Sequence, residues 1–209
     1  VGLLLAVGLA RRSKSGALFR VVFFMPRVVS VAVATLVWRW IYQPSFGPLN
    51  KLLSLAGLPE QKYLTSPEQA LPSIVVVLAW QALGFCIIIF LAGLESIPID
   101  FYEAAKIDGA RNWDLFRYIT LPLLNPTIVF LTVIGTINGI QVFTQVLNMS
   151  FQGMGGPLDS TKSLVLFIYQ QGFQHFKMGY ASAGTVVLFA LILVITLIQL
   201  KVMTRQVEY

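Results

Sequence analysis

The sequence predicts an all-α, polytopic membrane helical bundle in a single domain over residues 1–209. Hydrophobic residues make up 56% of the chain and charged residues 11%, less than half of the roughly 25% found in an ordinary soluble domain. No charged residue occurs between Glu68 and Glu95, between Arg117 and Asp159, or between Lys177 and Lys201. Each interval can hold the ~20 apolar residues that cross ~30 Å of hydrocarbon, so each predicts a transmembrane helix.

A fourth span is predicted from about Arg20 to Tyr42. Its two internal cations, Arg27 and Arg39, lie toward its ends, where long basic side chains reach the membrane interface. The apolar stretch Val1–Ala10 covers only about half the hydrocarbon thickness at ~1.5 Å per residue. We therefore expect about five spans with the first truncated, in an N-terminally incomplete chain that lacks an upstream part.

The basic residues predict which helix ends face the cytoplasm. If five spans alternate, segments 11–20, 95–120 and 201–209 share one side of the membrane, and segments 44–70 and 148–179 share the other. The first side holds nine Lys and Arg residues against four, so the positive-inside rule makes it cytoplasmic. Residues 95–120 and the C-terminus are thus expected in the cytoplasm. The nine are Arg11, Arg12, Lys14, Arg20, Lys106, Arg111, Arg117, Lys201 and Arg205; the four are Lys51, Lys62, Lys162 and Lys177.

Residues 95–121 form a charged loop that is too long for a simple turn. Pro98, the Glu and Ala residues that follow it and Gly109 predict a short helix from Pro98 to Asp108, ended by a left-handed glycine. A second short helix is predicted from Asn112 to Tyr118, and Pro122 fits the first turn of the next span. Such a loop suits a docked protein partner; the alternative is an interfacial helix on anionic lipid. Its aromatic anchors would be Phe101, Tyr102, Trp113 and Phe116.

Polar side chains recur along the helix predicted from Pro122 to about Leu147. Because they are 3, 4 and 3 residues apart, they lie on one helical face, which we expect to point into the bundle or a wet cavity. Their amides suit the hydroxyls of a neutral sugar; the alternative is that they bind neighbouring helices. Gln81 and Tyr42 are further candidates, and Trp38, Trp40 and Tyr42 fit an interfacial aromatic belt. The substrate-path candidates are Asn138, Gln141, Gln145 and Asn148.

The charged loop resembles the EAA loop of permease subunits of binding-protein-dependent ABC importers. The resemblance rests on Glu103-Ala104-Ala105, Asp108-Gly109-Ala110 and Ile119-Thr120-Leu121-Pro122. In that family the loop is a coupling helix that inserts into a cleft of the cytoplasmic ATPase. The resemblance therefore implies an ATPase-coupling role for Glu103, Ala104, Ala105, Asp108 and Gly109, and it raises Asn138 and Gln141 as substrate contacts.

Further segments resemble the carbohydrate-uptake class of these permeases. They are Phe46-Gly47-Pro48-Leu49-Asn50, Leu91 to Pro98, Gly155-Gly156-Pro157 and Gly179 to Ala183. Two departures stand beside them: the first family helix and part of the second are absent, and the run MSFQGMGGP is longer than usual. The resemblance implies the ABC importer permease fold and a subunit that forms half of the translocation path of an ATP-driven sugar importer.

The same resemblance implies the partners and the location. The expected partners are cytoplasmic ABC ATPase subunits, a second permease subunit, an extracytoplasmic sugar-binding protein, the carbohydrate and the lipid bilayer of a bacterial or archaeal cell (inner) membrane. The chain is expected not to be an enzyme. It has no nucleophile and base pair and no G-x-x-x-x-G-K-[ST] phosphate loop, so ATP would be bound by partner subunits. Its lone Cys86 supplies no metal cluster, and no cofactor or nucleic acid is expected.

Two other function classes remain as alternatives. An ion-coupled secondary transporter that acts without an ATPase would place acidic or histidine groups inside the membrane. Here the acidic residues fall outside the predicted spans, which argues against that class. A membrane scaffold without transport activity would explain the docking loop but not the polar face.

Overall fold

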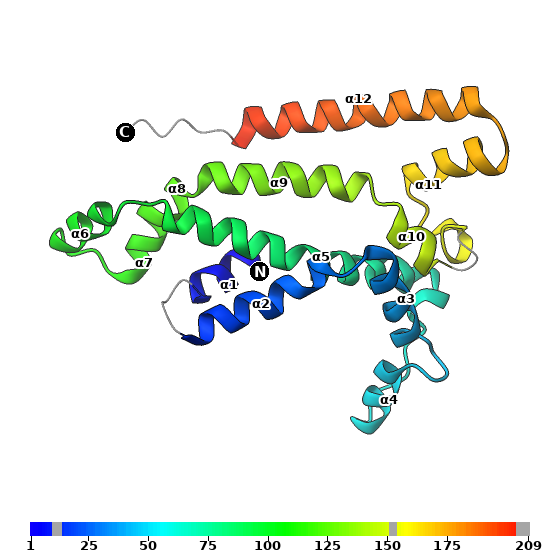
Figure 1. Ribbon diagram of the computed structural model, residues 1–209, viewed down its shortest axis with the longest axis horizontal. Coiled ribbons are helices and arrows are strands. Elements are labelled where there is room, and N and C mark those ends of the chain that lie inside the picture. The colour runs from blue at the N-terminus through cyan, green and yellow to red at the C-terminus, as the bar shows by residue number, and fades with distance from the viewer. Residues whose placement is uncertain (10–13, 151–153, 204–209) are drawn as a thin grey trace. The chain divides into compact units, whose positions relative to one another are not determined.

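The computed structural model describes residues 1–9, 14–150 and 154–203 and consists of helices joined by loops (Figure 1). Within these ranges no strand occurs, so the predicted all-α class is confirmed. The basic residues Arg11, Arg12 and Arg205 and the centre of the run MSFQGMGGP lie outside the described residues. The chain divides into two compact units: the first holds the described residues of Val1–Met25, Leu83–Ile137 and Leu193–Tyr209, and the second holds those of Pro26–Ala82 and Asn138–Ile192.

Two of the predicted spans are single long helices. α5 (Pro67–Glu95) and α12 (Met178–Met203) are each long and apolar enough to cross a membrane. Their charged residues, Glu68, Glu95 and Lys201, stand in the first or last turns. Up to four such spans are present in the described residues if each of two bent helix pairs counts as one.

The span predicted over Arg20–Tyr42 is two bent helices rather than one. α2 (Lys14–Val28) ends two residues before α3 (Val31–Ile41), and the pair is bent by more than 40°. Ser30 leaves the helical region at φ −52° and ψ 130°, four residues after Pro26, whose missing N–H weakens the last turn of α2. The prediction of an unbroken helix here was wrong.

The helix predicted from Pro122 to Leu147 is also broken. α9 (Asn125–Ile140) ends before the non-helical residues Gln141–Phe143, and α10 (Thr144–Met149) follows them. No proline marks the break. Instead the freed carbonyl of Val142 accepts a hydrogen bond of 2.7 Å from the Ser163 hydroxyl, so a tertiary contact satisfies a backbone group that the helix would otherwise have paired.

Apart from the segment between α5 and α9, the remaining described elements are short. Pro48 occupies the first turn of its helix, as its fixed φ favours, and Ser163 caps the helix that follows it by accepting from the Leu166 N–H at 3.2 Å. These elements are α1 (Gly2–Leu9), α4 (Pro48–Leu55), the 3-10 turns Tyr63–Thr65 and Pro157–Asp159, α11 (Leu164–Tyr169) and the π-helical turn Gln170–Gln174.

Each unit has its own packed interior. In the first, the close approach of Gly84 to the backbone of Phe23 brings α5 against α2. The C-terminal half of α12 lies along α9 (Figure 1). Two hydrogen bonds join these helices, from Gln199 to Thr136 Oγ1 (2.7 Å) and from Asn125 to the Met203 carbonyl (3.0 Å). In the second, a cluster of buried hydrophobic residues forms the core: Tyr42, Leu64, Ile74, Val77, Val146, Met149 and Leu166.

Candidate functional site

The charged loop of residues 95–121, called the EAA loop below after its Glu103-Ala104-Ala105 triplet, folds as two helical arms joined at Gly109. The first arm, α6 (Ile99–Ile107), ends in two crossed hydrogen bonds, from Ala110 N to the Ala105 carbonyl (2.9 Å) and from Gly109 N to the Lys106 carbonyl (3.0 Å). This is the Schellman motif, which needs a left-handed residue at the glycine position. Gly109 has φ +83°, so the predicted bend is confirmed.

The second arm is longer than predicted. It runs without interruption through α7 (Asn112–Asp114), a π-helical turn (Leu115–Thr120) and α8 (Leu121–Leu123), so the predicted end at Tyr118 was wrong. Pro122 lies inside this arm, and α9 begins at Asn125 after a bend of 61°.

Hydrogen bonds hold the two arms in place. The Asp114 carboxylate accepts from the backbone N–H of Arg111 at 3.0 Å and so caps the second arm. The Thr120 hydroxyl lies 3.2 Å from the Leu115 carbonyl and 3.0 Å from the Tyr102 hydroxyl. Because Thr120 is buried, these bonds fasten α6 to the π-helical turn from the inside.

The outer surface of the EAA loop carries the motif residues. Glu103, Ala104, Asp108 and Gly109 are exposed, and Ala105 is half-buried against the second arm. Large apolar side chains accompany them: Ile107 is 87% exposed, Trp113 66% and Tyr118 68%. Large exposed apolar side chains next to charges are typical of a protein interface.

An ion pair lies where α5 meets this loop. Arg20 Nη2 of α2 is 3.5 Å from Glu95 Oε1, the last residue of α5. The carboxylate is largely exposed, so solvent screens the pair and its contribution to stability is small.

The polar residues of α10 are engaged in hydrogen bonds within the second unit. Gln145 Nε2 donates to Gln81 Oε1 of α5 at 3.1 Å, and Asn148 Nδ2 donates to Thr35 Oγ1 of α3 at 3.0 Å. Arg39 Nη1 donates to the Asn148 carbonyl at 3.3 Å. The Gln145 and Asn148 amides therefore form hydrogen bonds between helices, which was the alternative to a contact with substrate.

The other two path candidates lie elsewhere. Asn138 is in the last turn of α9 and Gln141 is in the break after it, and both side chains are exposed. Because the helix is interrupted between Gln141 and Gln145, the expectation of one continuous helical face was wrong. Of the four path candidates, only Asn138 and Gln141 have side-chain amides that are exposed and without a hydrogen bond in the described residues.

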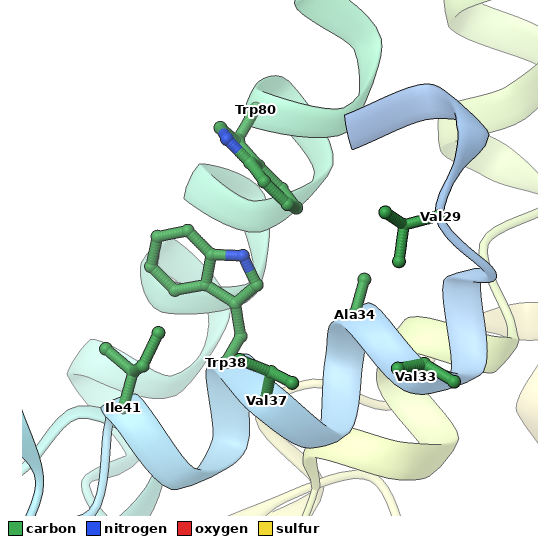
Figure 2. Close-up of a pocket in the computed structure, with 7 residues that line it drawn as sticks. All are labelled: Val29, Val33, Ala34, Val37, Trp38, Ile41 and Trp80. Carbon is green, nitrogen blue, oxygen red and sulfur yellow. The ribbon is translucent and has the colours of Figure 1, made fainter. Parts of the chain in front are cut away.

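An apolar cavity of about 220 Å³ lies between α3 and α5 of the second unit. Figure 2 shows the Trp38 and Trp80 rings entering it from the two helices, 5.4 Å apart and edge to face, beside Ala34. Its remaining lining residues are Val29, Val33, Val37 and Ile41. Apart from the indole N–H groups of Trp38 and Trp80 its lining is hydrocarbon, so this cavity offers few partners to a polar ligand. Trp38 packs inward and Tyr42 is buried, whereas Trp40 is 54% exposed; of the three predicted belt residues, only Trp40 has the exposure that a belt requires.

A second cavity of about 400 Å³ is lined by the loop between α3 and α5 and by the start of α5, and of its lining residues only Tyr42 was a candidate from the sequence. The Tyr42 and Tyr63 rings stand 5.0 Å apart on one side, and Glu68 and Gln61 border another. Partial burial raises the pKa of the Tyr63 phenol, so this ring is neutral at physiological pH. Single-residue patterns missed this site because its members meet only through the fold of the loop.

Comparison with known proteins agrees with this geometry. Residues 1–207 match the family of the binding-protein-dependent transport system inner membrane component. A probable ABC transporter permease protein of Bacillus subtilis is 40% identical over 99% of this chain and 67% of its own length. The trehalose/maltose transport system permease protein of Thermococcus litoralis is 34% identical over 97% of this chain and 67% of its own.

A solved structure shows the same fold. It is a chain of a bacterial ABC transporter involved in the import of the acidic polysaccharide alginate. The match has a TM-score of 0.87 at 27% identity and covers 99% of this chain and 72% of that chain.

Proposed function

We propose a carbohydrate as the substrate of this chain, which belongs to the family of binding-protein-dependent transport system inner membrane components. It is a membrane-spanning permease subunit of an ABC importer and not an enzyme. Among the relatives, one is named as a trehalose/maltose permease and another belongs to an alginate importer, which supports a sugar or sugar polymer here. In this proposal the subunit forms half of a translocation path, and ATP is bound by separate subunits.

The EAA loop is proposed as the surface that docks on a cytoplasmic ATPase. The observation that carries this proposal is the combination of a fixed frame and an exposed face: the Schellman motif at Gly109 and the Tyr102–Thr120 bond order the loop, while Glu103 and Ala104 face outward. A pre-ordered loop loses little conformational entropy on docking. It can transmit a push from its partner because only residues 96–98 separate α5 from α6 and only Leu124 separates the second arm from α9.

Asn138 and Gln141 are proposed as substrate contacts in the path. Both amides are exposed, and each can donate to and accept from a sugar hydroxyl. Asn138 lies in the last helical turn before the break at Gln141–Phe143, and Gln141 is the first residue of that non-helical segment. Non-helical backbone at membrane depth is tolerated where it lines a cavity, which favours a wet path at this point.

The proposed mechanism is alternating access. Closure of paired ATPases would move the EAA loops, and the helices would rock to open the path toward an extracytoplasmic binding protein. ATP can shift this equilibrium only by as much as it binds one state better than the other. The remaining proposed partner is a second permease subunit, and residues 95–120 and the C-terminus are proposed to face the cytoplasm.

The test is co-purification of the ATPase with the full-length permease complex. Glu103→Lys with Gly109→Asp reverses an exposed charge and places a side chain on a left-handed glycine. The chain offers a matched control in Glu60→Lys with Gly57→Asp, since Glu60 is also exposed and Gly57 has φ +71° with the same open surroundings as Gly109.

We expect the first double variant to lose the ATPase and the control to retain it, with both permeases still folded. Loss in both variants would mean that backbone strain alone disrupts the complex. If both variants retained the ATPase, the EAA loop would not be its docking surface, and the alternative of an interfacial helix on anionic lipid would stand.

A further inference from the structure

A network of amide side chains fixes the loop that forms the cavity of about 400 Å³ beside Tyr63. Asn50 Nδ2 donates to the carbonyls of Pro44 (3.1 Å) and Gln61 (2.9 Å), and Asn50 Oδ1 accepts from Gln61 N at 3.0 Å. Asn50 is only 3% exposed. Since every one of these bonds joins separate turns of the loop, the network fixes the loop rather than a single helix.

Gln69 extends the network to the rim of the cavity. Its Oε1 accepts from the backbone N–H groups of Lys62 (3.0 Å) and Tyr63 (2.8 Å), and its Nε2 donates to Gln61 Oε1 at 2.9 Å. The bonds to Lys62 and Tyr63 position the backbone from which the Tyr63 ring projects.

Tyr63 occupies a strained conformation that these bonds enforce. Its φ is +40°, a region that bulky residues rarely adopt. Such strain persists only where the surroundings over-determine it, and it clusters at ligand clamps. Its effect here is to place the Tyr63 ring against Tyr42, whose own hydroxyl donates to the Ser73 carbonyl at 3.2 Å.

The cavity offers two kinds of surface to a ligand. The Tyr63 ring, Leu49 and Pro72 supply apolar area, while Glu68 and Gln61 supply oxygen acceptors. The Glu68 carboxylate makes no ion pair or hydrogen bond with another residue in the described ranges, and Gln61 Oε1 uses one of its two lone pairs on Gln69. Glu68 is also the single charged residue in the lining.

We propose that this cavity is a binding site for a neutral sugar unit, a step that rests on the proposed carbohydrate function. Sugar rings have apolar C–H faces that pack on aromatic rings, and hydroxyls that donate to carboxylate and amide oxygens. The volume lies within the range of small-molecule sites. An anionic sugar is disfavoured because its charge would meet Glu68 with no cation in the lining. By the positive-inside bias, the site lies on the side of the membrane opposite the EAA loop.

The direct test is sugar binding to the assembled permease complex in nanodiscs without its binding protein. Maltose, trehalose and an alginate oligosaccharide are titrated by saturation-transfer NMR. We expect binding of the neutral sugars and weaker binding of the alginate. Glu68→Gln should weaken neutral-sugar binding about tenfold, Tyr63→Ala should abolish it, and Tyr63→Phe should preserve it because the ring remains.

Glu60→Gln is the matched control, because Glu60 is exposed in the same loop but does not line the cavity. Equal binding in wild type, Glu68→Gln and Tyr63→Ala would overturn the proposal, as would a preference for alginate or no binding of either neutral sugar. ATP-driven uptake is measured separately on the complex with its binding protein in sealed proteoliposomes. If the assembled wild type imports none of the sugars, the carbohydrate function fails; if it imports them while the variants bind normally, only the site fails.

Discussion

Asn148 Nδ2 donates a hydrogen bond to Thr35 Oγ1 at 3.0 Å and so joins α10 to α3 across 113 residues of sequence. Thr35 is completely buried, and its own hydroxyl donates within α3, to the Val31 or Ala32 carbonyl. The short helix α10, six residues long, cannot be stable by itself. Its place in the second unit therefore depends on contacts of this kind.

Thr35→Val should destabilise the second unit. The substitution keeps the shape of the side chain but leaves the Asn148 amide without its acceptor, at a cost of about 0.6 to 1.7 kcal/mol. Unfolding of the purified full-length protein in denaturant measures this change. Thr185→Val is the control, because Thr185 is exposed and bonds only within its own helix; equal losses in both variants would contradict the role of the Asn148 bond.

Alanine substitutions should separate the four path candidates into two pairs. Asn138→Ala with Gln141→Ala removes exposed amides, so we expect lower transport with unchanged stability. Gln145→Ala with Asn148→Ala breaks the bonds to α5 and α3, so we expect lower stability, by about 1 kcal/mol. Uptake and unfolding midpoints are measured on both. Unchanged uptake by an assembled Asn138 and Gln141 double variant would remove these residues from the substrate path.

Tyr102→Phe should weaken ATPase docking without unfolding the permease. It removes one hydroxyl from the bond to Thr120 that fastens α6 to the second arm, a loss of about 1 kcal/mol, or roughly fivefold in Kd, if the loop must be ordered to bind. Affinity for the ATPase is measured by titration in detergent. Tyr180→Phe is the control, because Tyr180 is 61% exposed and lies outside the EAA loop; equal affinities in the two variants would show that loop order does not matter.

Gly84→Ala should disrupt the packing of α5 on α2. A Cβ at Gly84 would overlap the Phe23 carbonyl oxygen and lie 2.9 Å from Phe24 Cα, and backbone cannot move aside as a side chain can. We expect a loss of about 1–3 kcal/mol or more, read from the unfolding transition. Gly8→Ala, in a helix with no atom within 4 Å of the new Cβ, should be neutral or slightly stabilising.

Local chemistry explains which features could be predicted from the sequence. α5 and α12 follow from charge-free apolar runs, and the turn at Gly109 follows from a glycine placed after a helix-forming stretch. The exposure of Glu103 follows because charged residues avoid the interior. Each of these features depends on residues that are close in sequence, so it can be predicted from the order of the amino acids.

The broken helices show where that information ends. The polar spacing from Asn138 to Asn148 fits a helix, yet the chain opens at Gln141–Phe143 because the Ser163 hydroxyl, more than twenty residues away, satisfies the Val142 carbonyl. Periodicity cannot register such a bond. The same limit hid the cavity beside Tyr63, whose ring, amides and carboxylate come together only through the Asn50 and Gln69 network.

The membrane environment, the long apolar helices and the EAA loop follow from the amino-acid order alone, since they depend on composition and on spacing along one chain. The bonds of Gln145 to α5 and of Asn148 to α3, and the open amides of Asn138 and Gln141, became known from the folded chain. A buried amide must find a partner, and which partner is within reach depends on how distant segments pack.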